Sequence, residues 1–67
     1  MEHRIKDLRA DIGLTQEQLS QRVGVSRQTI ISIENGRYNP SLELAYKIAK
    51  VFDRYIEDVF IFDKRSE

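Results

Sequence analysis

The sequence contains no cysteine, no tryptophan and only one histidine among its 67 residues. Without cysteine there is no disulfide, no thiol nucleophile and no cysteine-ligated zinc, and thiol usage says nothing about compartment. A single histidine, His3, is too few for a histidine-based metal cluster, and it forms no recognisable Ser-His-Asp arrangement with the scattered carboxylates. No glycine-rich phosphate loop is present either. We therefore expect no catalytic residues, no metal, no cofactor and no small-molecule ligand.

Long apolar runs are also missing. The longest is four residues, from Val59 to Phe62, whereas about 20 are needed to span a bilayer. Charged residues are spread through the first eleven positions, which does not fit a signal peptide. We expect a soluble cytoplasmic protein with no membrane partner.

The chain has no excess of either charge. Eleven Lys and Arg residues balance eleven Asp and Glu residues, so the strongly basic composition typical of many nucleic-acid-binding domains is absent. Residues 1–40 carry six basic against five acidic residues, and residues 41–67 carry five against six. Any DNA-binding face must therefore have a local positive potential only.

The length fits one small domain over residues 1–67. A chain of this size buries only about 60% of the surface that its unfolded form exposes, so its stability is marginal. In the absence of disulfides, we expect the missing stability to come from tight helix packing or from self-association.

The apolar spacing predicts a first helix near the N-terminus. Ile5, Leu8 and Ile12 recur at the spacing of one helical face. This pattern indicates a helix from about Arg4 to Ile12, and Gly13 stands where a left-handed residue ends many helices.

A second and a third helix follow in close succession. Thr15, with Gln18 three residues later, has the pattern of a capping box, and Gly24 ends the helix that it begins. Ser26 is an N-cap candidate for the next helix, which ends before Gly36.

Asn39-Pro40 predicts the N-cap and first position of a fourth helix. A short fifth turn is expected around Tyr55 to Phe60, so the fold class is all-α with four to five short helices. The apolar stripe of the fourth helix comprises Leu42, Ala45, Ile48, Ala49 and Phe52.

The short turn between the second and third helices is the feature that points to function. A three-residue turn containing Gly24 sets two helices at a steep angle, as in a helix-turn-helix over about residues 15–35. The free face of the third helix then carries Arg27, Gln28 and Ser32. Arg and Gln read guanine and adenine edges in the major groove. An ordinary three-helix core with a polar solvent face has the same spacing, so this pattern leaves both interpretations open.

The segment TQEQLSQRVGVSRQTIISIENGRYNPSLELAYKIAKVF resembles the Cro and phage-repressor helix-turn-helix family, called XRE-like. The motifs LTQEQLS, VGVS, RQTI, IENG and YNPSLELA occur in the family order, and the resemblance extends from about Arg4 to Phe60. It is strongest to small stand-alone regulators of the cytolysin-repressor type. The resemblance implies a lambda-repressor-like fold, operator binding as a homodimer and a short terminal two-stranded β-element.

The resemblance also implies roles for individual residues. The third helix, from about Arg27 to Asn35, becomes the recognition helix, in which Arg27, Gln28 and Ser32 match positions that contact base edges. The positions that match phosphate contacts or the loop along the DNA backbone are Gln16, Thr29, Asn35, Arg37, Tyr38 and Asn39. Gln16 also matches a residue that braces a recognition-helix side chain. For Gln16 and Thr29, the alternative is a plain role at a helix cap.

Arg9 and Glu34 match an arginine of the first helix and a glutamate of the recognition helix that pair in the family. Each of them follows a residue of an apolar stripe, so a partly buried bidentate ion pair is expected. Its role would be to orient the recognition helix, with no base contact.

Two positions depart from the family pattern. Ile31 is large and apolar where the family has a small or polar residue, and it either packs toward the first helix or touches a thymine methyl group; we favour packing. The segment Asp53-Arg54-Tyr55 replaces a Gly-Val-Ser-like connection, which leaves the start of the fifth helix open.

The apolar run at the C-terminus predicts a strand, for which alternating Met1, His3 and Ile5 are a suitable antiparallel partner. Phe52 and Ile56 are assigned to the core. Within a dimerisation element at residues 56–63, the side chains expected at a two-fold interface are Phe60, Ile61 and Phe62. The alternative is that all of them cap the core of one chain.

Together these observations favour a sequence-specific transcription regulator whose partner is double-stranded DNA. It would act as a repressor that binds a palindromic operator through the major groove as a homodimer. The alternative function is an antitoxin or protein-partner-binding module in which DNA binding is secondary, although no additional toxin-wrapping segment is evident.

Overall fold

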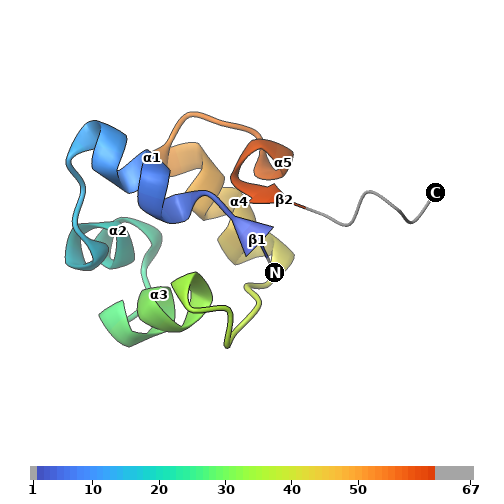
Figure 1. Ribbon diagram of the computed structural model, residues 1–67. Helices are drawn as coiled ribbons and strands as arrows, with labels where there is room; N and C mark the ends of the chain where they lie inside the picture. Colours follow the sequence, from blue (N-terminus) through green and yellow to red (C-terminus); the bar gives the residue numbers. More distant parts are fainter. Residues whose placement is uncertain (1, 62–67) are drawn as a thin grey trace.

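The described residues form five short helices and one small β-ribbon, which confirms the predicted fold class. The computed structural model describes residues 2–61. In chain order the elements are β1 (Glu2–His3), α1 (Ile5–Ile12), α2 (Gln16–Val23), α3 (Arg27–Glu34), α4 (Leu42–Val51), α5 (Ile56–Val59) and β2 (Phe60–Ile61) (Figure 1).

The predicted signals at the ends of α1, α2 and α3 are confirmed. The Thr15 hydroxyl accepts the Gln18 amide at 3.0 Å, and the Gln18 side chain accepts the Thr15 amide at 2.9 Å, which completes a capping box. Ser26 caps α3 by accepting the Thr29 amide at 3.1 Å. Gly13 and Gly24 end α1 and α2 with φ of 67° and 77°, a region that side chains with a Cβ disfavour.

The predicted start of α4 is wrong by two residues. The N-cap is Ser41, whose hydroxyl accepts the Leu44 amide at 3.1 Å, so Asn39 and Pro40 lie before the helix. The buried face also differs from the prediction at one position, because Leu44 is buried whereas Leu42 is 76% exposed. The predicted stripe therefore holds for its other members but not for Leu42.

One predicted core residue at the end of α1 is also wrong. Ile5 and Leu8 are buried as predicted, but Ile12 is 54% exposed. The core position is filled instead by Leu14, which lies just after the helix and is buried. Leu14 can turn inward because Gly13 reverses the backbone direction before it.

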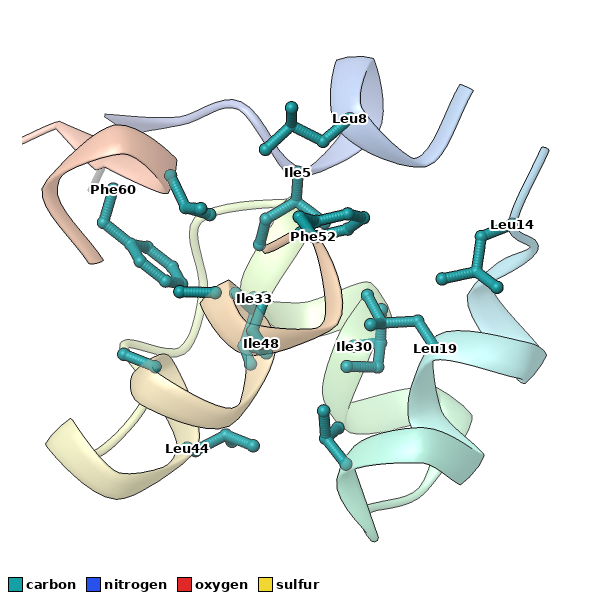
Figure 2. Close-up of a cluster of buried hydrophobic side chains, with 14 residues drawn as sticks. Ile5, Leu8, Leu14, Leu19, Ile30, Ile33, Leu44, Ile48, Phe52 and Phe60 are labelled. Carbon is teal, nitrogen blue, oxygen red and sulfur yellow. The ribbon is translucent and has the colours of Figure 1, made fainter. Parts of the chain in front are cut away.

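One apolar core lies between the helices. It receives side chains from all five helices and from β2, and Ile5, Leu19, Ile30, Ile48 and Phe60 surround its centre (Figure 2). α2 packs mainly against α3 and α4, and α4 also packs against α5. The recognition helix predicted from the sequence is therefore fixed from behind by α2 and the core.

The two ends of the described chain pair with each other. β1 and β2 form an antiparallel ribbon in which Glu2 faces Ile61 and His3 faces Phe60, and the Arg4 amide donates to the Val59 carbonyl at 2.8 Å. The predicted terminal β-element is confirmed, although Ile5 lies in α1 and not in the strand. Met1 is outside the described residues.

The ribbon corrects one predicted interface residue. Phe60 is only 1% exposed and belongs to the core of the single chain, so it offers no surface to a second copy. Ile61 is half-buried, and Phe62 lies outside the described residues. Phe52 is buried and Ile56 packs against the core, as predicted.

The start of the fifth helix, which the sequence left open, lies at Ile56, directly after the segment Asp53-Arg54-Tyr55. Asp53 has a φ of 58°, the left-handed conformation that a glycine would adopt without strain. The chain then reaches α5, where the Asp58 carboxylate accepts the Tyr55 amide at 3.2 Å. Of the helices in residues 2–61, none is long and apolar enough to cross a membrane.

The geometry of the α2–α3 turn predicts how sensitive it is to substitution. We expect Gly24→Ala to lower the free energy of unfolding by about 1–2 kcal/mol, because a left-handed backbone disfavours a Cβ. The cost comes from the backbone alone, since no atom lies within 4 Å of the added Cβ. Urea denaturation followed by circular dichroism measures it. Gly24→Asn should cost less, because Asn tolerates this conformation; equal losses in the two variants would contradict the explanation.

Candidate nucleic-acid interface

The apolar and polar residues of α3 lie on opposite faces of the helix. Ile30 and Ile33 are 0% and 2% exposed and face the core (Figure 2). Arg27 and Gln28 are exposed and Ser32 is half-buried. All three predicted base-contacting residues therefore reach the surface from one short helix of eight residues.

Two of these residues share a shallow hollow with the loop that follows α3. The hollow has a volume of about 280 Å³ and is lined by Ser26, Gln28, Thr29, Ser32 and Tyr38. The structure thus brings two predicted base-contacting residues together with two predicted backbone-contacting residues. Each lining side chain carries a hydroxyl or an amide group, which suits hydrogen bonding to base edges and phosphates.

Arg27 lies at a different hollow. It lines an open groove with Gln16 at the start of α2 and with Arg9, Gly13 and Leu14 on the side of α1. This groove places Arg27 and Gln16 together, at the adjacent N-termini of α3 and α2. Helix N-termini attract anions through their free amides and their dipole.

The loop after α3 is fixed to the recognition helix by its backbone. The amides of Arg37 and Tyr38 both donate to the Ser32 carbonyl, at 2.9 and 3.3 Å. Gly36, with a φ of 79°, permits this reversal. The side chains of the predicted backbone-contacting residues in this region are all exposed, namely Asn35, Arg37, Tyr38 and Asn39.

The predicted pair between Arg9 and Glu34 is present. The Arg9 Nε donates to Glu34 Oε2 at 2.8 Å, and Nη2 donates to Oε1 at 3.1 Å. The Glu34 side chain is fully buried and that of Arg9 is 17% exposed. The third guanidinium nitrogen, Nη1, donates to the Leu14 carbonyl at 3.0 Å, which also fixes the α1–α2 connection.

Gln16 joins the same carboxylate. Its Nε2 donates to Glu34 Oε1 at 3.0 Å, so this glutamine does brace a side chain of the recognition helix. Thr29 has a cap role, because its hydroxyl lies 3.0 Å from the Ser26 hydroxyl. Contacts of Gln16 and Thr29 with phosphate stay predictions.

His3 has a structural role that the sequence analysis missed. Its Nδ1 accepts the Ile5 amide at 3.2 Å, and its Nε2 lies 3.1 Å from the Glu34 carbonyl oxygen. With Nδ1 as the acceptor, Nε2 carries the proton and donates to that carbonyl. His3 therefore caps α1 and holds the C-terminus of α3 at once. No local sequence pattern points to a contact across 31 positions.

Within the described part of the chain, no three His, Cys, Asp or Glu residues gather as metal ligands. The surface of α3 and its neighbours instead offers hydrogen-bond donors, acceptors and a few cations. This combination on a helix that follows a tight glycine turn defines a helix-turn-helix DNA-binding domain.

Comparison with known proteins agrees with this class. Residues 5–59 match the helix-turn-helix family. An uncharacterized HTH-type transcriptional regulator of Archaeoglobus fulgidus is 61% identical over 66 residues, which cover 98% of this chain and 93% of that protein. The uncharacterized HTH-type transcriptional regulator YgzD of Bacillus subtilis is 48% identical, with 98% and 100% covered. The CTXphi transcriptional repressor RstR of Vibrio cholerae is 37% identical over 49 residues, 73% of this chain and 44% of that repressor.

Solved structures show the same relationship. The DNA-binding domain of SinR from Bacillus subtilis superposes with a TM-score of 0.77 at 29% identity, covering 96% of this chain and 91% of that one. SinR, the master regulator for biofilm formation, in complex with DNA gives a TM-score of 0.74 at 31% identity, with 81% and 87% covered. The chain belongs to the helix-turn-helix family of transcriptional regulators of the Cro/C1 (XRE) type, which is not a family of enzymes.

The buried carboxylate leads to a direct test. We expect Glu34→Ala to lower the free energy of unfolding by about 3 kcal/mol, because it leaves the largely buried Arg9 guanidinium without its counter-ion. Glu34→Gln keeps the shape and one acceptor, so it should lose less. Thermal and urea unfolding followed by circular dichroism measure both.

Glu43→Ala is the matched control. Glu43 pairs with Lys47 at 3.4 Å on the surface of α4, with side chains 80% and 51% exposed, and such pairs contribute about 0–1 kcal/mol. A loss in Glu34→Ala no larger than in Glu43→Ala would show that the Arg9–Glu34 pair does not hold the helices together.

Proposed function

We propose that this protein is a repressor that binds a palindromic DNA operator as a homodimer and reads it through the major groove with α3. The observation that carries the proposal is the outer face of α3, where Arg27 and Gln28 are exposed and Ser32 is half-buried, while the opposite face is anchored in the core. Arg suits guanine and Gln suits adenine as bidentate partners. In this role, Ser32 adds a short hydrogen-bonding contact.

The surrounding residues then position the domain on the DNA backbone. Thr29, Asn35, Arg37, Tyr38 and Asn39 follow the rim of the hollow beside α3 or the loop after it. Gln16 lies at the N-terminus of α2, where a phosphate gains from free amides and from the helix dipole. Since Gln16 also binds Glu34, a phosphate held there is linked directly to the anchor of the recognition helix.

Repression follows from occupying the operator and excluding polymerase. The similarity to the repressor RstR supports this direction of control. Two copies related by a two-fold axis would place their recognition helices about 34 Å apart, one turn of DNA, which requires a palindromic site. The relatives are proteins of archaea and bacteria, whose DNA lies in the cytoplasm, so this is where the regulator would act.

Selection of bound DNA from a random pool tests the proposal. We expect a palindrome to be enriched, and we expect Arg27→Ala and Gln28→Ala each to relax the preference at one base pair of each half-site. The cost for a lost bidentate contact is about 1–3 kcal/mol. Binding constants for the selected site and for single-base variants measure it.

Lys47→Ala is the control, because it removes an exposed cation from α4 and leaves α3 unchanged. It should keep the selected sequence. Binding that is blind to sequence, or no binding, would reject the proposal and favour a protein-partner-binding module.

The charge balance gives an independent prediction. Arg9 is neutralised by Glu34, so the cations directly at the recognition face are Arg27 and Arg37 in each protomer. Four cationic side chains at the DNA in a dimer, whether they contact bases or phosphates, neutralise about four phosphate charges, which corresponds to a slope of log K against log salt of about −4. Titrations of the selected site between 50 and 200 mM salt, about the range over which such slopes are measured, provide the slope. A value near −10 would contradict the assignment of cations.

A further inference from the structure

Ile31 is an apolar residue of α3 that neither the core nor the proposed function accounts for. It is half-buried. Among the described residues, the half-buried apolar side chains that pack against the core are Val25, Val51 and Ile56, and Ile31 is not one of them. α3 itself packs mainly against α2. Packing toward the first helix, the role that the sequence favours for Ile31, therefore does not account for the accessible part of this side chain.

The position of Ile31 around the helix places it among the residues proposed to read DNA. At about 100° per residue, Ile31 lies about 40° from Arg27 and about 60° from Gln28, in the angle between them. It lies about 100° from Ile30 and about 160° from Ile33, which are buried in the core. Residues three and four positions apart are neighbours on a helix surface, so Ile31 adjoins both Gln28 and Arg27. Its accessible part is thus on the outer side of α3.

Ile31 also separates the two hollows of the recognition face. Arg27 lines the groove at the N-termini of α2 and α3, and Gln28 lines the smaller hollow beside the loop that follows α3. Ile31 lines neither of them, and on the helix it lies between these two residues. The outer face of α3 therefore consists of two polar hollows with one apolar side chain between them.

A helix that lies in the major groove brings such a central side chain against the base edges. The Ile31 side chain makes no hydrogen bond, and covering a donor or acceptor of a base with it is unfavourable, because that group loses its bonds to water. The C5 methyl of thymine is the apolar group that unmodified DNA presents in the major groove. Contact with this methyl group removes apolar surface of both partners from water, which is favourable. The chemistry of Ile31 therefore selects thymine.

We propose that Ile31 is a specificity-determining residue that contacts the methyl group of a thymine in each half-site, next to a base pair read by Arg27 or Gln28. This inference rests on the proposed function, because it requires α3 in the major groove. It adds an apolar contact to a set of base contacts that otherwise consists of hydrogen bonds. The half-site is then read by two kinds of chemistry.

Replacing single thymines by deoxyuridine in a synthetic duplex of the selected site tests the proposal, because uracil pairs as thymine does and lacks only the C5 methyl group. We expect at least one thymine position in the half-site at which this replacement lowers the affinity of the unchanged protein about fourfold, the effect of one buried methyl-sized group. The affinity of Ile31→Ala should not depend on this methyl group. Ile31→Val keeps a branched apolar side chain and should keep most of the effect. Fluorescence anisotropy titrations measure the dissociation constants, and circular dichroism shows whether each variant is folded.

Val51→Ala is the matched control. Val51 is also half-buried and apolar, but it is the last residue of α4 and packs against the core. Its replacement should leave the ratio of the dissociation constants for the uracil and thymine duplexes as it is in the unchanged protein.

The outcomes separate this inference from the proposed function. Suppose that the protein selects a sequence that Arg27→Ala and Gln28→Ala relax. If its half-site then contains no thymine, or if no replacement of thymine by uracil weakens binding, Ile31 reads no methyl group, while the proposed function stands. If Ile31→Ala is as sensitive to the methyl group as the unchanged protein, another residue contacts it and this inference is wrong. If the protein selects no sequence, the proposed function fails and this inference falls with it.

Discussion

The buried carboxylate of Glu34 is the interaction on which the arrangement of the first three helices depends. It accepts two hydrogen bonds from Arg9 of α1 and one from Gln16 of α2. A buried charge is tolerated only with such partners, since an unpaired one costs several kcal/mol. The recognition helix is eight residues long, too short to be stable alone. Its orientation therefore comes from Ile30 and Ile33 in the core and from this one acid at its end.

The C-terminal end of α3 is held through its backbone as well. His3 contacts the Glu34 carbonyl oxygen, and the Ser32 carbonyl accepts the amides of Arg37 and Tyr38. The first contact links the terminal β-ribbon to α3, and the second sets the position of the following loop. Because side chain and main chain of Glu34 are both engaged, the ribbon, α1, α2 and α3 meet at one residue. A distortion at any of them changes how α3 is presented.

Sequence reasoning succeeded where the signal is local and failed where two local solutions compete. Thr15 with Gln18, Ser26, and the glycines after α1 and α2 mark helix ends through contacts within a few residues. Before α4, both Asn39 and Ser41 are good N-caps, and both Leu42 and Leu44 fit a helical stripe. Only packing selects Ser41, since it is Leu44 that reaches the core.

Phe60 shows a second limit. Its alternation with Val59 and Ile61 predicts a strand with two different faces. The chain, however, changes from helix to strand between Val59 and Phe60, so both side chains point inward and both are buried. The bonds of His3 show a third limit. A contact between a ring nitrogen and a carbonyl far away in the chain produces no pattern in the spacing of residues along the sequence. Arg9 and Glu34 were found only through resemblance to a family.

The neutral net charge connects these features to function. Arg9 is paired with Glu34 and has a structural role, so few cationic side chains remain beside the recognition helix to contact DNA. In the proposed function, this low charge gives little non-specific attraction to DNA, and the affinity comes from two domains on one site. On the proposed dimer, occupancy therefore rises steeply with protein concentration, because self-association and DNA binding are coupled equilibria.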